Sequence, residues 1–227
     1  VYDWIWENPE EFDVNGRDAL GQFFMAKEID LPWAFPYYGN TYTKCYVNMS
    51  GMIYFVTSDV QYSLTLNSLL GDNVIIPQAN DNVNGFIAAL GGSFDYPITH
   101  HEVVGEGDDQ KVVFTFSMRS LYQAADTSRV VFQTILYKDG RIKFQYKDVE
   151  KAVWRNKTIG IENRDGNDGL MISYSNRDYV QDRLAIMITP TTKLTLPAGG
   201  SRKVNLRIDS DGLTDGTYEG KVFIRSN

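Results

Sequence analysis

The stretch RVVFQTILYKDGRIKFQY, residues 129–146, decides the fold class of this 227-residue chain. Side chains alternate between the two faces of a β-strand, so apolar residues at every second position indicate a strand with one buried face. Seven positions in this stretch follow that period: Val130, Phe132, Thr134, Leu136, Ile142, Phe144 and Tyr146. Between the two runs, Asp139 and Gly140 supply the positive φ angles that a tight hairpin requires. The stretch therefore predicts a β-hairpin.

The same period of two recurs along most of the chain. Residues 112–118 alternate in this way, with one face in the core, and the polar turn 105–109 joins them to residues 98–104 as a second hairpin. A short helical turn is expected only within residues 58–70. Further strands are expected at residues 22–29, 44–47, 52–56, 86–90, 158–162, 170–175 and 184–188. Many short strands with few helices predict an all-β fold, a large antiparallel β-sandwich of the jelly-roll or lectin-like kind.

A domain boundary is expected near residues 189–192, where the sequence reads TPTT. Residues 1–189 then form the sandwich. Residues 190–227 contain two further apolar alternations, but they are too few for an independent sandwich. We expect them to be a partial immunoglobulin-like β unit, incomplete as the sequence stands.

Composition excludes several classes of protein. The net charge is −7 and the isoelectric point is near 4.9, and no cluster of Lys and Arg offsets the repulsion from a phosphate backbone, so nucleic acid is not an expected partner. No apolar run approaches the roughly 18 residues of a membrane span. The single cysteine, Cys45, rules out an internal disulfide.

Four stretches resemble a known family. Residues 31–42, LPWAFPYYGNTY, are similar to the opening motif of a β-sandwich module of large secreted bacterial and archaeal proteins. Residues 47–55, 132–146 and 159–170 resemble later parts of the same module, in the same order. The module often stands beside subtilisin-like proteases and is distantly similar to the nidogen-type extracellular domain. The resemblance implies an accessory module that attaches, spaces or assembles, while catalysis resides elsewhere.

Two further comparisons follow from that resemblance. Where the family commonly has an apolar-Pro-Phe-Trp-Asp-Asp stretch, residues 87–95 are IAALGGSFD, so a ligand role for those acidic residues is in doubt. The tail from Leu194 to Asn227 resembles the start of an immunoglobulin-like repeat, with PAGGS at 197–201 and DGTYEGKVFIRSN at 215–227.

Catalytic motifs are absent from the sequence. It has no Gly-x-Ser-x-Gly elbow, no His-Glu-x-x-His and no phosphate loop. The only histidines, His100 and His101, are adjacent, and adjacent strand residues point to opposite faces, so they cannot chelate one metal together. Cys45 alternates with polar neighbours as a small core residue does. We therefore expect no enzyme and no required cofactor.

Calcium is the one ion that the sequence suggests, because two turns are rich in oxygen ligands. The first turn offers Asp165, Asn167 and Asp168, and the second offers Asp209, Asp211 and Asp215. Both turns lack a full 12-residue calcium loop with its closing Glu. Asp, Asn and Gly are also the residues of ordinary turns, which is the alternative interpretation.

Aromatic residues and sequons complete the candidates. Trp4, Trp6, Trp33, Tyr37 and Tyr38 could form a sugar-stacking platform, although aromatic residues of a sandwich usually belong to its core. Asn48 and Asn156 begin the sequons Asn-Met-Ser and Asn-Lys-Thr, which makes them candidate glycosylation sites. Asn48 falls in an expected hairpin turn, where an exposed side chain is anticipated.

The sequence thus predicts a non-catalytic structural or assembly module of an extracellular or cell-surface protein. Its expected partners are other protein domains or copies of itself. One mode of assembly is a filament in which residues 1–6 add a strand to the C-terminal unit of a neighbour. The alternatives are that residues 1–6 pack in their own domain, and that the chain is a carbohydrate-binding or adhesion domain of a secreted protease or other hydrolase.

Overall fold

The computed structural model describes residues 2–5, 26–48, 50–55, 75–79, 84–92, 94–120, 129–149, 157–175 and 179–190. The helical turn expected within residues 58–70 lies outside these ranges, as do residues 191–227. Residues 2–190 form one compact unit. The domain boundary at residue 189 and the immunoglobulin-like character of the tail stay predictions.

Eleven strands and one short 3₁₀ turn are present in the described residues. The strands are β1 (Ala26–Tyr37), β2 (Asn40–Asn48), β3 (Met52–Tyr54), β4 (Phe86–Gly92), β5 (Phe94–Val104), β6 (Lys111–Ser120), β7 (Val130–Tyr137), β8 (Ile142–Asp148), β9 (Lys157–Glu162), β10 (Gly169–Tyr174) and β11 (Ala185–Ile188), and the turn is η2 (Gly107–Asp109). Every strand expected within residues 22–188 has a counterpart here, apart from the portions on residues 22–25 and on Val56, which are not described; the two apolar alternations expected after residue 190 lie outside the described residues.

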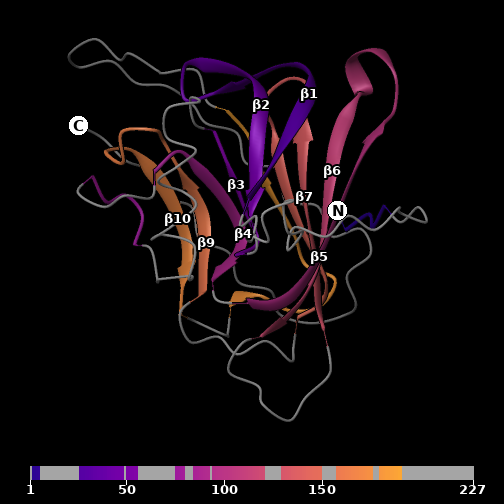
Figure 1. The fold of residues 1–227 in the computed structure, drawn as a ribbon, viewed down its shortest axis with the longest axis vertical. Helices are drawn as coiled ribbons and strands as arrows, with labels where there is room; N and C mark the ends of the chain where they lie inside the picture. Colours follow the sequence, from indigo (N-terminus) through magenta and orange to yellow (C-terminus); the bar gives the residue numbers. More distant parts are fainter. Residues whose placement is uncertain are drawn as a thin grey trace, which may run out of the picture. The chain divides into compact units, whose positions relative to one another are not determined.

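The strands form two antiparallel sheets (Figure 1). One sheet has the order β1-β2-β3-β4-β9-β10, and the other has the order β11-β8-β7-β6-β5. The chain passes from the first sheet to the second between Gly92 and Phe94. It returns to the first sheet for β9 and β10, and it enters the second sheet again at β11. Both predicted hairpins are confirmed, as β5–β6 and β7–β8. The all-β sandwich is therefore the fold.

The core lies between the inner faces of the two sheets and is rich in aromatic rings. Phe35 stacks on Phe55 with ring centroids 5.4 Å apart, and Phe116 stacks on Phe132 at 5.0 Å. Tyr37 places its hydroxyl in this core, where its single O–H lies within hydrogen-bond distance of the carbonyl oxygens of Phe86 (2.7 Å) and Glu162 (2.9 Å) and is shared between them. Burial raises the pKa of this tyrosine well above its ordinary value. The hydroxyl thereby ties β1 to β4 and β9 of the same sheet.

The outer faces of the sheets are buried as well, which the alternating pattern did not predict for residues 112–118. Val113 is 0% exposed and Thr115 is 8% exposed, although both lie on the face opposite the core. Residues 2–5 lie on this outer face, as the hydrogen bond from Gln133 to Ile5 shows. On the other sheet, a second cluster of buried residues comprises Tyr46, Met52, Tyr54, Ile76, Phe86 and Ala88. Residues distant in sequence, such as Ile5 and Ile76, therefore lie on the outer faces of the two sheets.

The β7–β8 turn differs in detail from the expected one. Gly140 has a φ of +89°, but Asp139 is not among the residues with positive φ, so only one of the two expected positive angles is present. The Gly140 amide donates to the Tyr137 carbonyl, and the Asp139 carboxylate accepts from the backbone amide and Nε of Arg141. The turn therefore contains more residues than the expected two-residue turn. Gly140 stands at its end, in the left-handed conformation.

We predict that Gly140→Val destabilises the protein by about 1–3 kcal/mol, because a β-branched residue is strained at positive φ. A Cβ at this position would also lie 2.9 Å from Cγ of Pro36 and 3.1 Å from Cγ of Pro190. Gly107→Val is the control, because Gly107 has a φ of +60° but nothing within 4 Å of its Cβ position. Thermal unfolding should show a larger loss for Gly140→Val than for Gly107→Val. Equal melting temperatures for Gly140→Val and the native chain would contradict this description of the turn.

Candidate interaction surface on the five-stranded sheet

A row of polar side chains crosses the outer face of the five-stranded sheet. His100 on β5 pairs with Thr115 on β6, Thr115 pairs with Gln133 on β7, and Gln133 pairs with Gln145 on β8. Directly paired residues of antiparallel strands share a face. Their chain neighbours, among them Phe114, Phe132 and Phe144, point into the core, so the row points away from it. We call Thr115, Gln133 and Gln145 the amide row.

The amide row is buried but only partly hydrogen-bonded. Gln133 Nε2 donates to Thr115 Oγ1 at 2.9 Å and to the carbonyl oxygen of Ile5 at 2.5 Å. In the part of the chain that the structure describes, Gln133 Oε1 has no hydrogen-bond partner, and neither polar atom of Gln145 has one. Gln145 is 0% exposed. Buried amides are normally paired, so this row departs from the usual pattern.

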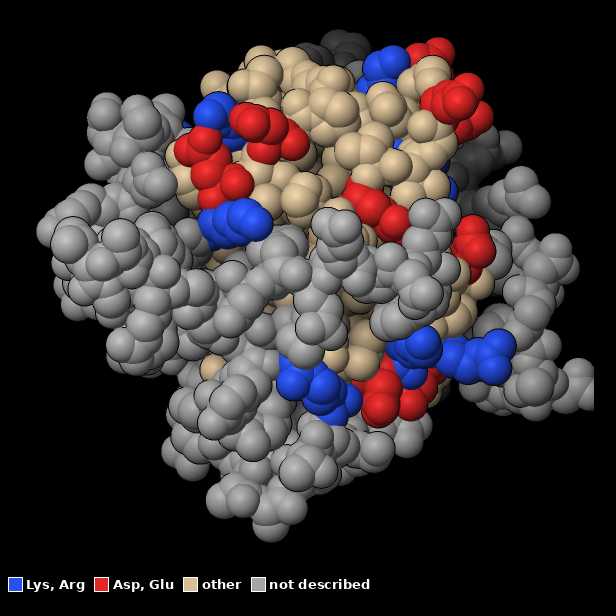
Figure 2. Space-filling model, turned by 45° about the vertical axis from the view of Figure 1, so that its right-hand side comes forward, with Lys and Arg blue, Asp and Glu red and all other residues tan. Residues whose placement is uncertain are grey.

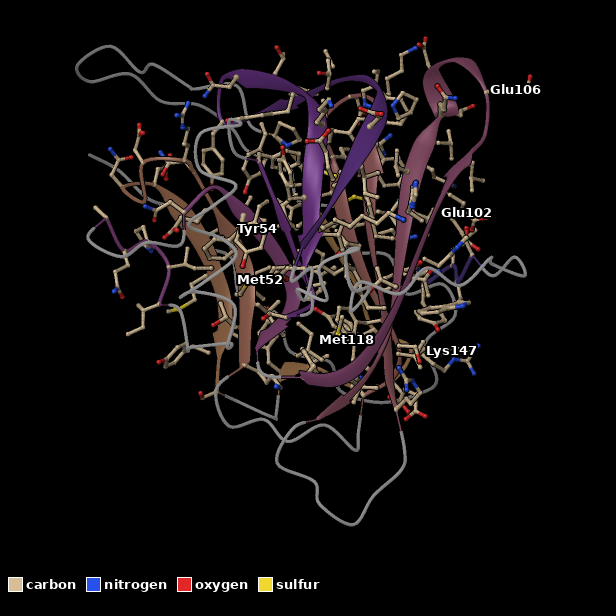
Figure 3. The ribbon with its side chains drawn as sticks, in the orientation of Figure 1. Met52, Tyr54, Glu102, Glu106, Met118 and Lys147 are labelled. Atoms are coloured by element: carbon tan, nitrogen blue, oxygen red, sulfur yellow. The ribbon has the colours of Figure 1, made fainter. Side chains whose placement is uncertain are left out.

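Basic side chains flank the amide row. On β8, Lys143 and Lys147 lie on the same outer face as Gln145, two residues to either side of it. Lys147 Nζ lies 5.4 Å from the centroid of the Trp4 ring. Burial lowers the pKa of Lys143, while the Asp3 carboxylate acts in the opposite direction and Lys111 adds to the lowering. In Figure 3, Lys147 and Glu102 lie at the side of the molecule, away from the interior residue Met118.

The two histidines lie on opposite faces, as predicted. His101 pairs with the core residue Phe114, and the two rings stack with centroids 6.0 Å apart. Burial lowers the pKa of His101, and His100 and Lys27 lower it further. Within the described residues, no group of three or more His, Cys, Asp or Glu side chains is placed to hold a metal ion.

Cys45 is fully buried in the core, which confirms its predicted place. Burial raises the pKa of its thiol, so the nucleophilic thiolate is disfavoured. Lys157, which the sequence did not single out, is also buried, with Nζ 3.9 Å from the centroid of the Phe94 ring. Desolvation lowers the pKa of Lys157 to about 8. Phe94 belongs to the stretch that departs from the family motif, and here it packs against a cation.

The acidic turn of Asp165, Asn167 and Asp168 is organised by the side chain of Asn163. Asn163 Oδ1 accepts from the backbone amides of Asn167 and Asp168, each at 3.1 Å, and its Nδ2 donates to Asn167 Oδ1 at 2.7 Å. Asn167 Oδ1 is thus engaged within the turn itself. Calcium binding at this turn stays a prediction, as it does for Asp209, Asp211 and Asp215, which lie outside the described residues.

The aromatic residues expected to form a platform are spread over different parts of the fold. Tyr37 is in the core between the sheets, Trp33 packs against that core, and Tyr38 meets the Tyr37 ring edge-on at 4.9 Å. Trp4 lies beside Lys147 on the outer face of the other sheet. Trp6 is outside the described residues. The four described rings therefore do not form one flat stacking surface.

Asn48, the first candidate glycosylation site, is 0% exposed, so the expectation of an exposed side chain there is wrong. Its Oδ1 accepts from the backbone amides of Ser50 (3.1 Å) and Met52 (3.2 Å), and its Nδ2 donates to Tyr54 Oη at 3.2 Å. The asparagine closes the connection between β2 and β3 from inside. A glycan on Nδ2 would have to displace these contacts. Asn156 lies outside the described residues.

We predict that Asn48→Ala, made in unglycosylated protein, lowers the free energy of unfolding by about 2–4 kcal/mol, because it leaves buried donors unpaired. Ser50→Ala is the matched control, since it also removes the sequon but keeps the Asn48 side chain. Denaturant unfolding should show the larger loss for Asn48→Ala. If the two variants are equally stable, the hydrogen bonds of Asn48 do not have the structural role described.

Figure 2 shows acidic and basic side chains interspersed over the visible face. Within the described ranges, no helix has the length and apolarity needed to cross a membrane.

The amide row was not singled out from the sequence, although Gln133 and Gln145 stand on the outward positions of the decisive hairpin. Counting residue pairs outward from the Asp139-Gly140 turn places Gln133 opposite Gln145 on neighbouring strands. This pairing could have indicated from the sequence that the two glutamines share the outer face. The contact of Gln133 with Ile5 could not be inferred, since it joins residues 128 positions apart in the sequence.

Comparison with known proteins agrees with this architecture. A family model described as NIDO related matches residues 17–201. No curated protein and no solved structure matches the chain. Because the matched residues span most of its length, the chain belongs to the NIDO-related, that is nidogen-related, family.

Proposed function

We propose that this chain is a non-catalytic structural or assembly module of an extracellular or cell-surface protein. The observation that supports the proposal is the match to the nidogen-related family over residues 17–201. This family consists of non-enzymatic modules that are typically extracellular. A module of this kind acts through its surfaces, so its function depends on which faces of the sandwich remain available to partners.

The environments of the reactive side chains also favour a non-catalytic role. The Cys45 thiol is buried with a raised pKa, and the partly buried His101 stacks on the core residue Phe114. Glu28 accepts hydrogen bonds from Lys44 and from Tyr46 Oη across β1 and β2. Each group thus has a structural contact that accounts for its position. A nucleophile instead needs a neighbouring base within hydrogen-bond reach.

Assembly by strand sharing is a finer form of this proposal. Residues 2–5 lie against the outer face of their own sheet, through Gln133 and Lys147. This arrangement favours the alternative in which residues 1–6 pack in their own domain. The acceptor that the sequence suggested lies in residues 191–227, outside the described residues. Carbohydrate binding has less support, because the described aromatic rings do not form one stacking surface.

We predict that the purified chain hydrolyses no peptide, ester or glycoside substrate. Fluorogenic substrate panels should give rates equal to those of buffer. A Cys45→Ala variant, which removes the buried thiol, is a control for contaminating activity, since it should behave identically. Turnover that copurifies with the native chain and is abolished by a point substitution would contradict the proposal.

A further inference from the structure

Gln145 presents an energetic problem that the described part of the chain does not solve. Its side chain is fully buried, and both polar atoms lack a hydrogen-bond partner within the described structure. Burying an amide without hydrogen bonds is unfavourable, whereas an apolar side chain of similar size at this position would have no such cost. Unpaired buried groups of this kind call for an explanation such as a function or an absent binding partner.

The amide row has the hydrogen-bonding chemistry of a peptide backbone. Each glutamine offers one carbonyl acceptor and an NH₂ group with two donors, which match the N–H and C=O groups of an extended chain. Gln133 already uses its Nε2 in this way, by donating to the backbone carbonyl of Ile5. Gln145 lies directly opposite on the next strand, so a backbone crossing both strands could pair with both amides.

Residues 2–5 indicate which side chains suit this face. The Asp3 carboxylate favours the charged form of Lys143 beneath it, and the Trp4 ring lies beside Lys147. Ile5 supplies the backbone carbonyl for Gln133. The segment therefore matches the basic flanks of the amide row by charge and by aromatic contact. Its hydrogen bond to the row is with Gln133, yet Gln133 Oε1 and both polar atoms of Gln145 stay without a partner in the described structure.

We propose that the amide row is a docking site for an extended, acidic and aromatic peptide segment of a partner protein, and that residues 2–5 occupy part of this site in its absence without pairing with Gln145. The occupant replaces residues 2–5, pairs its backbone with Gln133 and Gln145, and places a carboxylate near Lys143. The inference rests on the proposed assembly role, and it identifies one surface through which the module assembles.

The test uses the full chain and a fluorescently labelled synthetic peptide, VYDWIWEN, which has the sequence of residues 1–8. Because residues 2–5 compete for the site within the same chain, a Trp4→Ser variant is titrated beside the native protein. Fluorescence anisotropy should show peptide binding, with higher affinity for Trp4→Ser. A peptide with Lys in place of Asp3 should bind at least about fivefold more weakly, because it would meet Lys143 with like charge.

The decisive variant is Gln145→Met, made in the Trp4→Ser background, with Gln110→Met as the matched control outside the row. Gln145→Met should weaken peptide binding at least about fivefold, the effect of about one hydrogen bond, and should leave the melting temperature equal or higher. If Gln145 had only a structural role, its replacement would lower the melting temperature, so weaker binding at an equal or higher melting temperature indicates a role in binding. Gln110→Met should leave binding unchanged.

Three outcomes would overturn the proposal. The peptide could bind neither the native chain nor Trp4→Ser, or it could bind Gln145→Met as tightly as the parent. The chain could also associate with itself through the amide row in sedimentation experiments, which would make a second copy the occupant instead of a separate partner. None of these outcomes bears on the absence of hydrolysis, which the substrate panels test separately.

Discussion

Burial on both faces of β6, β7 and β8 is the constraint on which the rest of the structure depends. The inner face packs Phe116, Phe132 and Phe144 against the other sheet, as expected of a sandwich. The outer face holds Val113, Ile135 and Gln133, each fully buried. A sheet with apolar residues on both faces requires a covering layer on each. Residues 2–5 contribute to that layer through contacts that span 128 residues of sequence.

This constraint connects the architecture to the proposed role. The interior is fixed by aromatic packing and by the Tyr37 hydroxyl, so the sandwich is a rigid support. The contacts of the covering segment with the sheet include a hydrogen bond from Gln133 and the approach of Lys147 to Trp4. In the proposed role, a partner segment takes the place of residues 2–5 on this face of the scaffold.

The sequence was sufficient for the local structure. Alternation and turn residues predicted the β7–β8 and β5–β6 hairpins, and the period of two placed His100 and His101 on opposite faces. Contacts between distant segments could not be predicted. Asn48 is buried and donates to Tyr54, and Gln133 donates to Ile5, which lies far outside its own hairpin. Turn chemistry is the same for an exposed and a buried asparagine, so the sequence pattern gave no sign of the difference.

The central claim is that residues 2–5 lie on the amide row in the free protein. The most direct measurement is the side-chain amide signal of Gln133 in the NMR spectrum, assigned by its loss in Gln133→Met. The account predicts a nuclear Overhauser effect between the Gln133 NH₂ group and Ile5, together with slow exchange of those protons with water. Rapid exchange without any contact to residues 2–5 would contradict it.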